Sequence, residues 1–283
     1  MNKFYLLLLL TCSHLSQAQE FVPYQVFSAI GKKVTDKQLI AGLSKADVVL
    51  FGEFHDNSIV HWLQLKVVQE LHKKQHIQLG AEMFERDNQS QITAYLNGDL
   101  NEKAFDSTVR FWPNYKTDYK PLLEFAKTQK LPFTATNVPR KYASLVFKKG
   151  TAVLEELPAQ ERAFMAPLPF PFDPELPSYK KMLALLPDHS NDNFPKAQAI
   201  KDATMAYSIV ENKSKDRLFI HFNGSYHSDY YEGIAWYIKH YNPHLKVVTI
   251  TTVTQETLKN LKSENKLKAD FIIVTDPEIT KTY

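Results

Sequence analysis

Six runs of apolar residues, rich in β-branched and aromatic side chains, predict the strands of this protein. Most of these runs are continuously apolar rather than alternating, which is typical of strands covered on both faces of a sheet. The runs lie at residues 47–53, 77–84, 131–137, 217–223, 246–253 and 269–275.

Helical patterns lie between the runs. Residues 58–74 place apolar side chains at spacings of three and four, and Asp56 or Asn57 precedes them as a candidate N-cap. Further helices are predicted at residues 119–130, 194–211 and 230–241. Strands that alternate with helices of this length indicate βαβ units and a mainly parallel sheet.

Two stretches break the alternation. Residues 89–112 hold two short helical patterns, 90–96 and 102–109, with no strand predicted between them. Residues 143–192 contain a proline- and phenylalanine-rich centre at 167–177, which regular helix or central strand does not accommodate. We interpret this segment as a lid or contact surface over the sheet edge; a surface loop stiffened by proline is the alternative.

These patterns predict a three-layer α/β fold. A mostly parallel sheet is flanked by helices, and a helical, proline-rich excursion covers its carboxyl edge. We expect a single domain over residues 19–283, with the inserted, lid-like segment at about 143–192.

The N-terminus has the pattern of an export signal. Lys3 is followed by an apolar stretch at residues 4–10, and Ser16 and Ala18 form a small-x-small cleavage site, so we expect a signal peptide at residues 1–18. Cys12, the single cysteine of the chain, lies inside that segment. Lipidation at Cys12 is a less favoured alternative, because Thr11 stands where a smaller residue is usual.

Charge and composition narrow the ligand classes. The formal net charge is +3 and no basic block occurs, which argues against nucleic acid. The 14 Tyr and 18 Phe suit either a flat apolar ligand or an aromatic core.

Two similar phrases follow two of the predicted strands. Gly52 and His55 enclose one phrase, which includes Glu53, and Gly224 and His227 enclose the other. A third predicted strand carries Glu82 close to its end. Since the carboxyl edge of an open α/β sheet is where ligands bind, we expect these side chains to share one site. Histidine and carboxylate serve both metal binding and acid–base chemistry, so the reaction stays open.

The carboxylate of Glu82 needs a partner, because an unpaired charge at the end of an apolar strand is costly. Arg86 or Arg140 could pair with it, or it could act as a ligand or base. Asp202, in the predicted helix 194–211, has the ordinary interpretation of a surface acid.

Taken in order, several phrases of the chain resemble the ChaN-like family of exported haem-binding proteins, within the Tiki/TraB and erythromycin-esterase-like superfamily. The resemblance covers residues from about 46 to 241. The matching phrases are GEFHD at 52–56, GAEMFER at 80–86, YKPLL at 119–123, NVPR at 137–140 and DATMA at 202–206, with His61, Gln64, Gln198, Gly224 and His227.

The resemblance implies an exported, periplasmic or outer-membrane-associated protein of bacterial iron acquisition. It would bind haem as a homodimer with a tyrosine ligand to iron, and an outer-membrane haem receptor would be its partner. We expect Tyr179 or His189 at the iron, and Arg86 and Arg140 as further haem-binding residues.

Other branches of the superfamily imply a different function. There, similar histidines and acids hydrolyse peptides with a divalent metal such as zinc or manganese, or esters without one. On that alternative His55, Glu82 and His227 would bind the metal, and Glu53 would join them as a catalytic residue. Whether the chain is an enzyme is left open; a non-catalytic partner-binding module is a third alternative.

Overall fold

Eight strands form one sheet in the order β2-β1-β8-β7-β3-β6-β4-β5. The computed structural model describes residues 22–185 and 192–283. Strands β3 to β8 pair with one another in parallel, whereas β1 is antiparallel to β2 and β8. The strands are β1 (Tyr24–Ser28), β2 (Lys33–Val34), β3 (Val48–Glu53), β4 (Ile77–Glu85), β5 (Phe133–Asn137), β6 (Leu218–Gly224), β7 (Val247–Thr254) and β8 (Phe271–Thr275).

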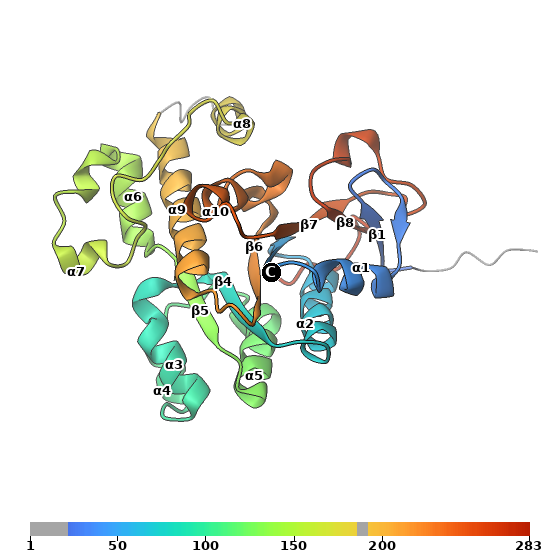
Figure 1. The fold of residues 1–283 in the computed structure, drawn as a ribbon, viewed down its shortest axis with the longest axis horizontal. Helices are drawn as coiled ribbons and strands as arrows, with labels where there is room; N and C mark the ends of the chain where they lie inside the picture. Colours follow the sequence, from blue (N-terminus) through green and yellow to red (C-terminus); the bar gives the residue numbers. More distant parts are fainter. Residues whose placement is uncertain (1–21, 186–191) are drawn as a thin grey trace, which may run out of the picture.

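Helices cover both faces of this sheet, and Figure 1 shows the two groups on opposite sides of the strands. One core lies under α1 (Asp36–Leu43), α2 (Ser58–His72), α3 (Gln89–Asn97), α4 (Glu102–Thr108) and α5 (Lys120–Gln129). The other lies under α6 (Arg140–Lys149), α8 (Pro177–Leu185), α9 (Asn193–Asn212) and α10 (Ile234–Tyr241).

The central strand β3 explains why the apolar runs are continuous. Val49 and Phe51 point into the first core, and Val48 and Leu50 point into the second. Because successive side chains of a strand face opposite sides, a strand between two helical layers is apolar at every position. The predicted three-layer, mostly parallel α/β fold is confirmed.

Local signals set the helix ends. The side chain of Asn57 accepts a hydrogen bond from the amide of Val60, which caps α2. The predicted start of the helix at 230 is wrong, since α10 begins at Ile234. Tyr230, Tyr231 and Gly233 have positive φ angles of 60°, 62° and 51°, and a right-handed helix does not contain such backbone.

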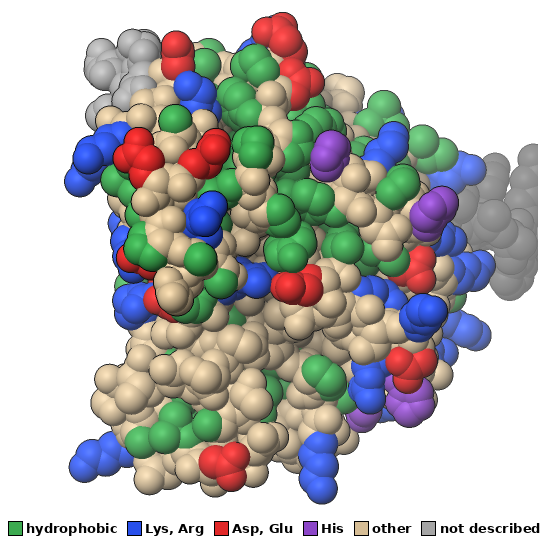
Figure 2. Space-filling view, turned by 60° about the vertical axis from the view of Figure 1, so that its left-hand side comes forward, with side chains coloured by type: hydrophobic (Ala, Val, Ile, Leu, Met, Phe, Trp, Pro, Cys, Tyr) green, Lys and Arg blue, Asp and Glu red, His purple; other side chains and the backbone are tan. Residues whose placement is uncertain are grey.

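The proline-rich excursion joins α6 to α8 and includes the short helix α7 (Ala159–Arg162). Its α8 end lies against the loop that leaves β6, because the amide of Ser178 donates to Glu232 and the hydroxyl of Tyr226 donates to the carbonyl of Ser178. In the space-filling view, hydrophobic side chains gather on the part of the molecule that carries α8 (Figure 2). The segment therefore reaches the carboxyl edge, as predicted.

The chain also returns to this edge at its end (Figure 1). Lys281 forms an isolated bridge with Asn57, and the amide of Thr282 donates to the carbonyl of Asp56. No helix within residues 22–185 and 192–283 is long and apolar enough to cross a membrane.

Candidate functional site

The two glycine–histidine phrases emerge side by side at the carboxyl edge. β3 and β6 are parallel neighbours, and Glu53 stands opposite Gly224 in their register. A Cβ atom at Gly224 would lie 2.8 Å from the Nε2 atom of His55, and a Cβ atom at Gly52 would lie 3.0 Å from the Cα atom of Ser225. Each glycine therefore leaves room for the other phrase.

The first phrase forms a histidine–carboxylate pair. Nδ1 of His55 lies 2.9 Å from Oε1 of Glu53, whose side chain is fully buried while that of His55 is 32% exposed. The hydroxyl of Tyr119 donates to the same Glu53 oxygen at 2.6 Å, and Gln64 donates to the other. Burial alone would lower the pKa of His55, but the bond to Glu53 and the charge of Glu82 outweigh it and raise that pKa.

A buried polar network holds the backbone of His55. Its carbonyl accepts a hydrogen bond of 2.9 Å from Nε2 of His61 and one of 2.8 Å from the Asn114 amide. Asn114 also donates to Asp118, and the hydroxyl of Thr282 donates to Asp118 at 2.7 Å. The position of His55 is thus fixed by groups from α2, the loop before α5 and the end of the chain.

The second phrase carries a buried imidazole between two carboxylates. Nδ1 of His227 lies 2.5 Å from Asp202, and Nε2 lies 3.2 Å from Glu82. Burial would lower the pKa of His227, yet the charges of Glu82 and Asp202 outweigh it and raise that pKa to about 10. His227 is therefore an imidazolium at neutral pH.

The two carboxylates around His227 differ in acidity. Burial would raise the pKa of Glu82, but His227 and a 2.8 Å hydrogen bond from the amide of Gly224 hold it well below its ordinary value. Burial raises the pKa of Asp202. Glu82 is the stronger counter-ion because it also has a backbone donor.

Both phrases open onto one pocket of about 490 Å³. Glu53, His55 and His227 line it from the sheet side. Lys281 and Tyr283 line it from the end of the chain, which crosses the same edge. The structure thus brings Glu53, His55 and His227 to one concave site, with Glu82 bonded to His227 beside it.

Other predicted site residues lie elsewhere. Arg86 donates to Ser208 at 2.7 Å and pairs with Glu211, and Arg140 is exposed at the start of α6. Of the alternatives left open for Glu82, pairing with Arg86 or Arg140 is not found, because His227 takes that place. The interpretation of Asp202 as a surface acid is also wrong, since Asp202 is buried against His227.

One of the two predicted iron ligands is buried in the described structure. Tyr179 is 1% exposed, and its hydroxyl donates to Asp202 at 3.3 Å. Burial and the charge of Asp202 raise the pKa of Tyr179. His189 lies outside the described residues.

Sequence reasoning missed two partners of the site. Tyr119 was noted only as part of a matching phrase, and nothing local marks it as the donor to Glu53. Asp202 did carry a signal, because Ala199, Ala203 and Ala206 indicate a helix face packed closely on the sheet. An acid on such a face needs a buried partner.

The side chains do not have the arrangement of a metal centre. In the part of the chain that the structure describes, no group of three or more His, Cys, Asp or Glu side chains could hold a metal ion. Both ring nitrogens of His227 are bonded to carboxylates, Nδ1 to Asp202 and Nε2 to Glu82. The metal site predicted from His55, Glu82 and His227 is not supported.

Comparison with known families gives a match over most of the chain. A family model described as haem-binding uptake, Tiki superfamily, ChaN matches residues 39–238. No curated protein matches the chain.

Solved structures share the fold at low sequence identity. A Campylobacter jejuni ChaN structure, described as binding haem cofacially, is 16% identical, with 89% of this chain and 97% of that chain covered and a TM-score of 0.68. A Bacillus cereus protein is 12% identical, with 85% and 91% covered and a TM-score of 0.51. At these identities the likeness concerns the fold.

Proposed function

We propose that the chain binds haem as an exported protein of iron acquisition, because it belongs to the haem-binding uptake family ChaN of the Tiki superfamily. The described residues fit haem if they offer an accessible ligand for the iron, apolar or aromatic walls for the ring and cations for the propionates. The loop between β6 and α10 supplies the ligand and the aromatic walls, and Lys268, which precedes β8, supplies the cation.

Tyr230 is the accessible ligand, and it carries the proposal. Its side chain is 45% exposed, and no described residue is hydrogen-bonded to its hydroxyl. Its left-handed backbone, at φ 60° and ψ 20°, is unusual for a bulky residue. Such conformations persist where the surrounding structure enforces them, and they cluster at functional sites.

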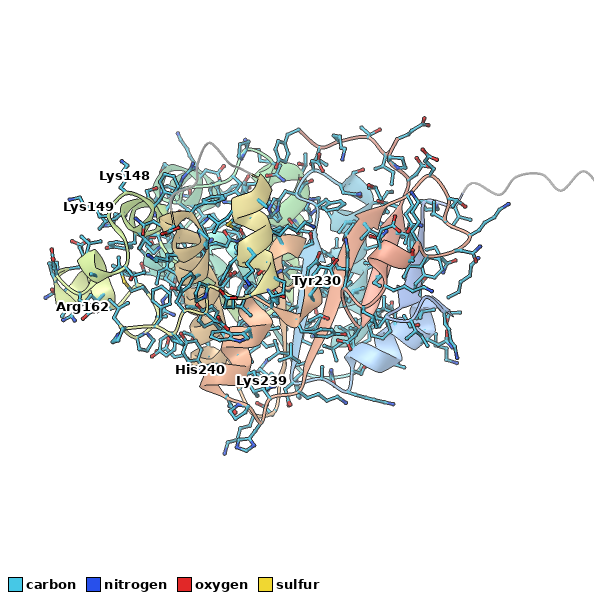
Figure 3. The ribbon with its side chains drawn as sticks, turned by 90° about the horizontal axis from the view of Figure 1, so that it is seen from above. Lys148, Lys149, Arg162, Tyr230, Lys239 and His240 are labelled. Carbon is cyan, nitrogen blue, oxygen red and sulfur yellow. The ribbon has the colours of Figure 1, made fainter. Side chains whose placement is uncertain are left out.

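The residues around Tyr230 suit haem, which is a flat ring with two negatively charged propionates. Tyr226 and Tyr231 are also exposed on the same loop, and Nζ of Lys268 lies 6.0 Å from the centroid of the Tyr230 ring. Figure 3 shows Tyr230 near the middle of the molecule, well apart from Lys148, Lys149 and Arg162 at one end. Lys268 is therefore the cation that we assign to a propionate.

Bound haem would supply a ferric ion that accepts a tyrosinate oxygen. Burial, Asp229 and Glu232 raise the pKa of Tyr230, so the free phenol is protonated at neutral pH. Binding would release that proton, and the affinity for haemin should rise with pH.

An absorbance titration with haemin tests the proposal. We expect a saturable Soret shift at a stoichiometry near one, a changed spectrum in Tyr230→Phe and an unchanged one in the matched control Tyr231→Phe. A flat titration would refute haem binding. Identical spectra for Tyr230→Phe and the parent chain would refute the ligand assignment and leave haem binding standing.

Export, contact with an outer-membrane haem receptor and dimerisation belong to this proposal. The signal pattern at residues 1–18 supports export. Cell fractionation tests the location, and recovery of uncleaved chain from the cytoplasm would contradict it. Light scattering with and without haemin tests the dimer.

Hydrolysis is a second candidate function, favoured by the Glu53–His55 pair in the pocket. Nε2 of His55 could take a proton from water while Glu53 stabilises the imidazolium. Because the pKa of His55 is raised, activity should rise with pH as His55 loses its proton. Hydrolysis of 4-nitrophenyl acetate tests this candidate. Equal rates for His55→Ala, for the exposed-histidine control His244→Ala and for the parent chain would eliminate it.

A further inference from the structure

A groove on the opposite face of the sheet from α9 and α10 has no part in the site described above. It lies between α1 and α2 and has a volume of about 480 Å³. Leu39 and Ile40 of α1 and Leu63 and Val67 of α2 form its apolar floor. This volume falls within the range of small-molecule sites, about 300–1,000 Å³.

Two aromatic rings form a wall of the groove. Trp62 is 47% exposed, which is unusual for the largest apolar side chain, and its ring centroid lies 6.2 Å from that of Tyr24. The hydroxyl of Tyr24 donates to Asp36, so the ring is held in place. The wall is therefore an ordered, partly exposed aromatic surface.

The rim of the groove is cationic. Lys37, Lys66 and Lys74 line it, and none of the three is ion-paired within residues 22–185 and 192–283. Of its two acids, Asp36 accepts the Tyr24 hydroxyl and Glu70 pairs with Lys73 at 2.5 Å. Nζ of Lys66 lies 5.9 Å from the Trp62 centroid, so a cation stands beside the exposed ring.

We infer that this groove binds a free aromatic carboxylate. The ring of such a ligand would pack on Trp62 and the apolar floor, and its carboxylate would lie among the three lysines. A neutral aromatic would lack the second interaction, and a small inorganic anion would lack the first. The inference is independent of haem binding, which we place at the loop after β6.

Calorimetric titration of the full chain with 1-naphthoate tests the inference, with 1-naphthalenemethanol as the neutral ligand of the same shape. We expect Trp62→Ala to weaken 1-naphthoate binding by about 2- to 12-fold, which corresponds to the free energy of one aromatic–aromatic contact. Lys66→Met should weaken it by up to about 5-fold, and added salt should reduce the difference. The matched control is Lys239→Met, which removes a lysine at the end of α10 (Figure 3).

Three results would overturn the inference. The first is that the alcohol binds as tightly as 1-naphthoate, which would show that the lysines do not select an anion. The second is that Trp62→Ala and Lys66→Met both bind 1-naphthoate like Lys239→Met, which would place the ligand elsewhere. The third is that haemin displaces 1-naphthoate and loses its Soret shift in Trp62→Ala, which would make the groove the haem site. A failed haemin titration alone leaves the inference intact.

Discussion

Replacing His227 with glutamine should destabilise the protein by removing the imidazolium between Glu82 and Asp202. All three side chains are buried, and the two bonds are 3.2 Å and 2.5 Å long. Removing one partner of a buried ionic group costs about 3–5 kcal/mol, because the remaining charges are left without compensation. The rise in the pKa of His227 from 6.5 to about 10 corresponds to about 5 kcal/mol at about 1.36 kcal/mol per pH unit, which is of the same order.

The same pKa sets the pH dependence. His227 has a raised pKa in the folded state, so its contribution is fully present below about pH 6.5 and is lost as pH rises towards 10. Over that interval the unfolded chain releases a proton that the folded protein retains. Between about pH 6.5 and about pH 9.5 this one group should remove about 4 kcal/mol of stability.

Urea unfolding at these two pH values measures both effects. We expect His227→Gln to be about 3–5 kcal/mol less stable than the parent chain at the lower pH, and to lose much less on going to the higher pH. His244→Gln, at an exposed histidine, is the control for generic loss of a titrating ring. A stability within about 0.5 kcal/mol of the parent, or an unchanged pH dependence, would refute the assignment of a buried imidazolium.

The glycines and the N-cap give three further predictions. Gly52→Ala should cost about 1–3 kcal/mol in urea unfolding, since its Cβ would lie 2.8 Å from the carbonyl oxygen of Ile250, and an unchanged midpoint would contradict this close approach. Gly224→Ala should displace the His55 ring, so the NMR titration of that ring should change. A titration curve like that of the parent chain would count against the close contact between Gly224 and His55. Asn57→Ala should cost about 1–3 kcal/mol, because it loses both the cap and the 2.9 Å hydrogen bond from its amide to the Thr275 hydroxyl, and an unchanged unfolding midpoint would argue against both contacts.

Much of the fold could be predicted because it follows from local patterns. The six predicted strands correspond to β3 to β8, and the apolar period placed α2 and α9 within a few residues of their observed bounds. The two edge strands β1 and β2 were not predicted. β2 contains only two residues, and so short a segment carries no period to recognise.

The candidate site was predicted in part. Matched glycine spacing brought His55 and His227 into one hypothesis, and the parallel register of β3 and β6 places them together. The counter-ion of Glu82 was left open, with Arg86 and Arg140 as the candidates, and the structure gives His227 instead. Arg86 is four positions away in the chain, but it follows an irregularity in the pairing of β4 with β5 and extends to Glu211 at the end of α9.

The sequence by itself determined which segments become strands and that two glycine–histidine phrases follow two of them, because hydrophobic period and glycine placement act over a few neighbouring residues. Only the tertiary structure decided which charges meet. Tyr119 reaches Glu53 across 66 positions, and Glu82 accepts the amide of Gly224 across 142. Such pairs depend on strand order, register and the face to which each side chain points, and a buried charge is stabilised by whichever partner that geometry brings within hydrogen-bonding distance.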